Sequence, residues 1–168
     1  MTKKEYVKTK ILLSYGASWG NVVEETENFI CFPEKKLIFY DTIAHRFSQK
    51  YDMEMACYGF ERETKSSYDI NLFFSMKDYD VECSFYAEHE RKELELFIEL
   101  FDPNFHAFIT KGPIELTPSE RYTLKSIIKD FLEEIKDVKR FRLPMVTGSL
   151  TYDEASLEEE LERRVVLV

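Results

Sequence analysis

Every second residue is apolar in three successive runs within residues 68–100, whose sequence is YDINLFFSMKDYDVECSFYAEHERKELELFIEL. Strict alternation of this kind is typical of β-strands that bury one face. The apolar positions of the three runs are Ile70, Leu72, Phe74 and Met76, then Val81, Cys83, Phe85 and Ala87, then Leu94, Leu96, Ile98 and Leu100. Because Met53, Met55 and Cys57 alternate in the same way upstream, the sequence predicts a four-strand antiparallel meander.

The connections between these runs predict how the strands pair. A two-residue hairpin turn at residues 77–78 puts Leu72 opposite Cys83. A polar turn at residues 89–92 then puts Cys83 opposite Ile98. Both registers place the apolar residues on one face, and a meander with a single core requires this agreement.

The N-terminal third of the chain predicts helices. Residues 2–15 begin with capping-box spacing and favour a helix, although residues 8–15 could equally be a strand. The same spacing before residues 22–30 favours a second short helix, and we interpret residues 16–20 as the turn between the two. Residues 33–51 carry apolar side chains at steps of three and four, which predicts a longer helix rich in basic residues.

Two further helices are expected downstream of the meander. Thr117, Pro118 and Glu120 form a strong helix start, and the apolar stripe that follows should cover the core face of the sheet. Residues 151–168 predict a short C-terminal helix that docks on the body of the protein or on a partner. The expected fold is a single α+β domain over residues 1–168, with N-terminal helices, a four-strand antiparallel meander, a long covering helix and a short C-terminal helix.

Charge limits the classes of partner that the protein can have. The chain has 168 residues, 32 acidic against 23 basic side chains, and a formal net charge of −9. Such a surface repels free nucleic acid and anionic membranes, so we expect no direct contact with either. It attracts a basic protein surface, although solubility alone also explains the charge.

The cysteines and the lengths of the apolar stretches indicate in which cellular compartment the protein is expected. The three cysteines are odd in number and have no C-x-x-C spacing, which argues against a disulfide framework and a structural zinc site. No stretch resembles a signal peptide or approaches the length of a transmembrane helix. We therefore expect a cytoplasmic protein.

A search for catalytic patterns gives no candidate. His45, His89 and His106 lack metal-ligand spacing and have no evident nucleophile or base beside them. Phosphate-binding loops, nucleophile elbows and zinc-protease motifs are also absent from the sequence. We expect no catalytic residue, no metal and no cofactor, so that replacing any of these histidines with alanine should preserve activity.

The outward face of the meander is the candidate site, because it interleaves acidic and aromatic side chains. The residues expected to contact a partner are Asp69, Phe73, Asp80, Glu82, Tyr86, Glu95, Phe97 and Glu99, and the same face carries Glu54, Tyr58, Asn71 and Glu93. The register places Glu82 directly opposite Glu99, where like charges destabilise a sheet unless they are solvated or a cation lies between them. Acids mixed with aromatics suit an interface that receives Lys or Arg from a partner.

These patterns lead to a protein-binding hypothesis with open alternatives. The first is a non-enzymatic module, of bacterial or phage type, that engages or inhibits a basic protein, for example a nucleic-acid-binding one. The face could instead be simply solvated, or covered by the basic helix expected at residues 33–51. A small-molecule binder or enzyme could form an aromatic pocket between sheet and helices from Tyr40, Phe74, Phe85 and Phe131. A homodimer is the remaining alternative.

Overall fold

The computed structural model describes residues 2–19, 22–62, 67–77, 79–88, 93–102, 107–108, 113–135 and 152–168. Its helices are α1 (Lys3–Trp19), α2 (Asp41–Tyr51), α3 (Pro118–Ile135) and α4 (Glu154–Arg164). Its strands are β1 (Glu24–Glu25), β2 (Phe29–Phe32), β3 (Lys35–Phe39), β4 (Met55–Arg62), β5 (Ser67–Met76), β6 (Tyr79–Glu88), β7 (Glu95–Asp102), β8 (Ala107–Phe108), β9 (Ile114–Leu116) and β10 (Val165–Leu167). The α+β class predicted from the sequence is confirmed.

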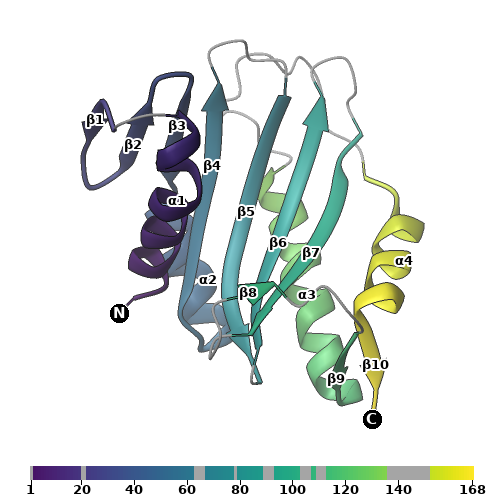
Figure 1. Ribbon diagram of the computed structural model, residues 1–168. Helices are drawn as coiled ribbons and strands as arrows, with labels where there is room; N and C mark the ends of the chain where they lie inside the picture. Colours follow the sequence, from purple (N-terminus) through teal and green to yellow (C-terminus); the bar gives the residue numbers. More distant parts are fainter. Residues whose placement is uncertain are drawn as a thin grey trace.

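One antiparallel sheet dominates the fold, with its strands in the order β1-β2-β3-β4-β5-β6-β7-β8. The predicted meander corresponds to β4–β7, but the sheet contains more strands than the four that were predicted. The hairpin β2–β3 extends the sheet on one side, and β8 pairs with the end of β7 on the other. A second, two-stranded sheet forms where β10 runs parallel to β9. Figure 1 shows the large sheet with α1 in front of it and with α2 and α3 behind.

The predicted register of the meander is confirmed. Leu72 lies opposite Cys83, and Cys83 lies opposite Ile98, with all three side chains fully buried. This face packs on α2 and α3, whose apolar stripes complete the main core. The ring of Phe131 on α3 lies 5.8 Å from that of Phe47 and 5.6 Å from that of Phe85, measured between centroids. The long helix therefore covers the core face, as the sequence predicted.

Two of the predicted capping boxes, those at Thr2 and at Thr117, are present. The backbone N–H of Thr2 donates to Glu5 Oε2 at 2.8 Å, and the N–H of Glu5 donates back to Thr2 Oγ1 at 3.1 Å. The same exchange joins Thr117 and Glu120 at 2.9 and 3.2 Å. Reciprocal bonds of this kind satisfy two backbone donors at a helix start. Residues 8–15 are accordingly helical, and the strand alternative for them is wrong.

Residues 16–39 differ from the prediction. The helix α1 continues to Trp19, so the turn expected at residues 16–20 is wrong. Residues 22–30 contribute β1 and the start of β2 instead of a helix. Pro33 and Glu34 form a turn between β2 and β3, and α2 starts only at Asp41. Burial alternates along β2 and β3, and pairing of β3 with β4 fixes both strands in the sheet.

The C-terminal helix α4 docks along the edge of β7, as Figure 1 shows. Leu157 and Leu161 join the main core. Glu160 Oε1 accepts a hydrogen bond at 3.1 Å from the backbone N–H of Ile98. The helix expected for residues 151–168 ends at Arg164, where the chain becomes β10. Within the described part of the chain, no helix has the combined length and apolarity that crossing a membrane requires.

Candidate docking groove on the sheet

The outward side chains of β5, β6 and β7 lie in rows that cross the sheet. The first row is Asp69–Tyr86–Glu95, the second is Asn71–Ser84–Phe97 and the third is Phe73–Glu82–Glu99. Directly opposed residues of an antiparallel pair share a face and have Cβ atoms about 4.5–5.5 Å apart. Each row is therefore a set of neighbouring side chains, as the sequence-based register predicted.

The helix α1 covers part of this face. Phe73 is 0% exposed, Asp80 is 3% exposed, and Asn71 and Tyr58 are also buried. Val7 and Ile11 of α1 form a second core cluster with Phe73 and with the β2–β3 hairpin. Phe73 and Asp80 are consequently not available to a partner, which corrects the prediction. The covering helix is also not the basic one expected at residues 33–51, because α2 packs on the opposite face.

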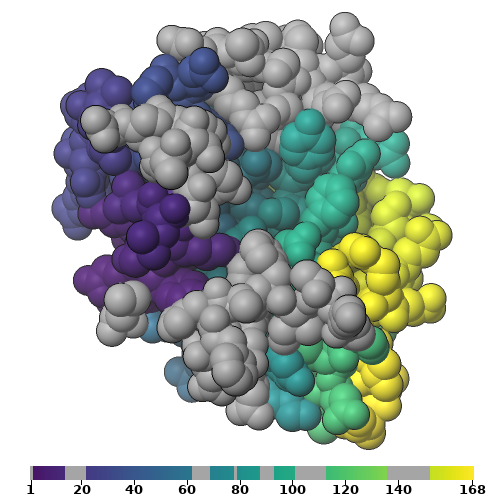
Figure 2. Space-filling view, viewed as in Figure 1, coloured from purple at the N-terminus to yellow at the C-terminus, as the bar shows by residue number. Residues whose placement is uncertain are grey.

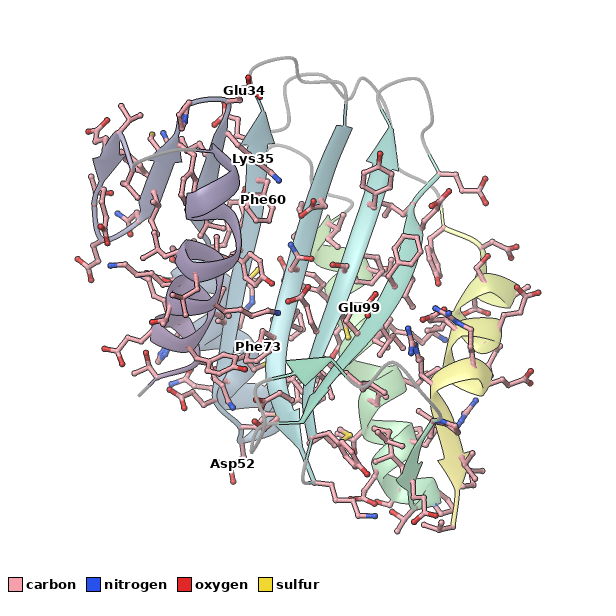
Figure 3. The ribbon with its side chains drawn as sticks, in the orientation of Figure 1. Glu34, Lys35, Asp52, Phe60, Phe73 and Glu99 are labelled. Carbon is pink, nitrogen blue, oxygen red and sulfur yellow. The ribbon has the colours of Figure 1, made fainter. Side chains whose placement is uncertain are left out.

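The contacts of Phe73 and Asp80 explain why α1 lies there. The ring of Tyr6 stacks on Phe73 with 5.3 Å between centroids, and Lys3 Nζ lies 5.5 Å from the centre of the Phe73 ring. Lys3 Nζ also lies 3.0 Å from Asp80 Oδ1, and Ser75 donates a hydrogen bond to the same carboxylate. These contacts give both residues a role in holding α1 against the sheet. Figure 3 shows Phe73 beside α1 and Glu99 on the open part of the face.

Between α1 and α4 the sheet face remains open. A hollow of about 570 Å³ is lined by Asp69, Glu82, Ser84, Tyr86, Glu95, Phe97 and Glu99, and we call it the sheet groove. In Figure 2 this part of the sheet lies recessed between α1 in purple and α4 in yellow. Six of the eight predicted site residues line the groove. Ser84 was missed, although its position between Glu82 and Tyr86 in the alternation places it on the same face.

The third row carries its own cations. Glu82 and Glu99 lie directly opposite each other, as predicted. Lys10 Nζ of α1 lies 3.7 Å from Glu82 Oε2, and Arg164 Nη2 of α4 lies 3.8 Å from Glu99 Oε2. The hydroxyl of Tyr58 donates a further hydrogen bond to the Glu82 carboxylate. The chain itself therefore supplies the positive charge that we expected a partner to bring to this row.

Burial changes the acid–base properties of this row. Loss of solvent raises the pKa of the Glu82 carboxyl, and the nearby Lys10 and the Tyr58 hydrogen bond oppose that rise. Loss of solvent likewise lowers the pKa of Lys10, against the opposing effect of Glu82. Each charge thus depends on the other for compensation in a desolvated place. This end of the groove serves to seat α1.

The first row is the open end of the groove. Glu95 is exposed, and Asp69 and Tyr86 are partly so. Asn71 Nδ2 donates to Asp69 Oδ1 at 2.9 Å, while Ser84 donates to Asn71 Oδ1, so the polar floor holds the Asp69 carboxylate in place. Of the other face residues named from the sequence, Glu54 and Glu93 are exposed and lie just outside β4 and β7.

The residues considered for an aromatic pocket belong to the interior. Phe74, Phe85 and Phe131 are fully buried, and Phe85 and Phe131 pack against each other. Tyr40 lies at the margin of the same core. These rings fill the space between the sheet and its helices.

The groups able to carry out chemistry are few among the described residues. His45 lies exposed on α2, while His89 and His106 fall outside the described residues. Burial raises the pKa of the thiols of Cys57 and Cys83, which keeps them protonated and unreactive. Within the described ranges, no group of three or more His, Cys, Asp or Glu side chains is arranged to hold a metal ion.

Comparison with known proteins adds no relative. No family model, no curated protein and no solved structure matches this chain. We therefore infer a function from the residues of the groove.

Proposed function

We propose that the protein is a non-enzymatic binding module whose sheet groove receives a basic surface of another protein. The observation that supports this is the composition of the groove lining, which combines four carboxylates with two aromatic rings. None of the lining residues that the structure describes is Lys, Arg or His. Aromatic side chains beside acids suit a contact with Lys or Arg, because a cation gains from both the charge and the ring face.

The charge of the whole chain acts in the same direction. A net charge of −9 attracts a basic partner over a distance, and the acidic groove is the site at which that partner would bind. Electrostatic attraction of this kind mainly raises the association rate and weakens as salt screens the charges. The exposed ring of Phe97 adds apolar area that persists at high salt.

The proposal extends to the kind of partner and its setting. A nucleic-acid-binding protein has the required basic surface, and an acidic groove would then occupy the place of a phosphate backbone. In this role the module acts as an inhibitor, in the cytoplasm of a bacterial cell and encoded by the bacterium or by a phage. Such a partner would lose nucleic acid when it binds the groove.

The test uses three baits: the wild-type protein, a control variant altered outside the groove and a variant altered at one groove residue. Wild type and the Glu24→Gln control, whose altered residue is exposed on β1, should retain one basic protein at equal amounts. The Glu95→Gln variant should bind the same protein about tenfold more weakly, a loss of about 1.4 kcal/mol. Affinities are measured by calorimetry at low and at physiological salt, and the difference between the variants should shrink as salt rises.

Two results would contradict the proposal. The first is equal affinity of the wild-type and Glu95→Gln proteins for the retained partner at both salt concentrations. The second is a stoichiometric partner without a basic surface. Either would return the groove to an ordinary solvated sheet face.

A further inference from the structure

The first row places an aromatic ring between two carboxylates. Asp69 on β5 is directly opposite Tyr86 on β6, and Tyr86 is directly opposite Glu95 on β7. Because neighbouring strands lie about 4.8 Å apart, the two acidic residues are separated by about 10 Å across the row. The row therefore combines one aromatic side chain with a carboxylate side chain on each neighbouring strand.

This order matches the chemistry of a guanidinium group. Guanidinium is planar, stacks on aromatic rings and carries donors on more than one edge, so it can lie over Tyr86 and reach both carboxylates. Two charge-assisted hydrogen bonds of about 2.8 Å, one on each side of a flat cation, fit the separation of Asp69 and Glu95. The ammonium group of lysine is compact and strongly hydrated, so it can pair with only one of these acids at a time.

Neighbouring side chains hold part of the first row in a fixed position. The hydrogen bond from the buried Asn71 fixes one oxygen of Asp69, and Ser84 fixes Asn71 in turn. Phe97, next to Glu95 in the alternation of β7, is 38% exposed and forms a wall of the same hollow. Preorganised acceptors lower the entropy lost on binding. The chain also places a guanidinium of its own at the groove, where Arg164 meets Glu99.

We propose that an arginine side chain of the partner protein occupies the first row, with its guanidinium over Tyr86 and between Asp69 and Glu95. This inference rests on the proposed function and names the contact that the basic partner makes. It makes the groove selective for arginine over lysine.

The test uses two capped peptides of equal length and charge, one with three arginines separated by glycines and one with three lysines in their places. Each is titrated into the full-length protein while the ring signals of Tyr86 and Phe97 are followed by nuclear magnetic resonance. The arginine peptide should bind at least about fivefold more tightly than the lysine peptide. Asp69→Asn and Glu95→Gln should each remove that preference, and the Glu24→Gln control should retain it.

The outcomes separate the two proposals. Equal binding of both peptides that is lost in Glu95→Gln would overturn arginine selectivity and leave the basic-partner proposal standing. No response of the groove signals to either peptide at up to about 10 mM would overturn both proposals. Thermal unfolding of each variant is also recorded, because a lower melting temperature would show that the loss of peptide binding comes from a destabilised fold. If Asp69→Asn is destabilised in this way, the result for Glu95→Gln decides the test, because the side chain of Glu95 is exposed.

Discussion

The Phe73→Ala variant should unfold about 3–5 kcal/mol more easily than the wild type, because it leaves a cavity between α1 and the sheet. Phe97→Ala should change the free energy of unfolding by less than about 1 kcal/mol, since that ring is partly in solvent. The two residues lie on the same face of β5 and β7, which are separated only by β6, and the alternation of the sequence does not distinguish them. Only the position of α1 makes one a core residue and the other part of an open groove.

Urea unfolding followed by circular dichroism measures both changes. Phe73→Leu keeps most of the volume and should lose clearly less stability than Phe73→Ala. Phe97→Ala should instead weaken binding of the arginine peptide while the fold stays intact. If Phe73→Ala were as stable as the wild type, α1 would not cover this part of the sheet and Phe73 would return to the candidate interface.

Much of the central sheet could be predicted because its signals are local. Alternation at period two shows which side chains share a face, and short hairpin turns fix which residues pair. This was enough to place Glu82 opposite Glu99 and to bring six groove residues together. Alternation does not show what packs over a face, however. Nothing in residues 68–100 indicates that the outward ring of Phe73 is covered.

The N-terminal region was mispredicted for a different reason. Capping-box spacing also occurs outside helix starts, and a proline fits a tight turn as well as the first turn of a helix. The choice for residues 33–39 depends on pairing with β4, where Leu37 meets Phe60 more than twenty residues later. A contact over that separation leaves no pattern in the short segment itself. The helical periodicity of α2 was detected correctly but extended too far upstream.

The ion pairs of the groove could not be predicted from the sequence either. Lys10 lies 72 residues before Glu82, and Arg164 lies 65 residues after Glu99. The like-charged pair was visible from the register, but its two cations come from helices at opposite ends of the chain. Because the third row already contacts α1 and α4, we assign the contact with a partner to the first row. There the carboxylates flank a ring instead of seating α1.

The Lys3→Ala variant should lose about 3 kcal/mol of stability, because it leaves the buried Asp80 carboxylate without its cation. Hydrogen bonding from Ser75 remains, but a neutral donor compensates a desolvated charge only in part. Lys8→Ala is the matched control on the same helix, since its ion pair with Glu25 is exposed on both sides and should contribute less than about 1 kcal/mol.

Urea unfolding of the two variants measures the contrast, and the Lys3→Met/Asp80→Leu double variant tests its cause. Removing both charges together should restore much of the lost stability, because no unpaired carboxylate then remains in the interior. If Lys3→Ala and Lys8→Ala were equally mild, the Asp80 carboxylate would have to be solvated in the folded protein. The N-terminal turn of α1 would then lie away from β5 and β6, and the wall that α1 gives the groove would not be fixed by this ion pair.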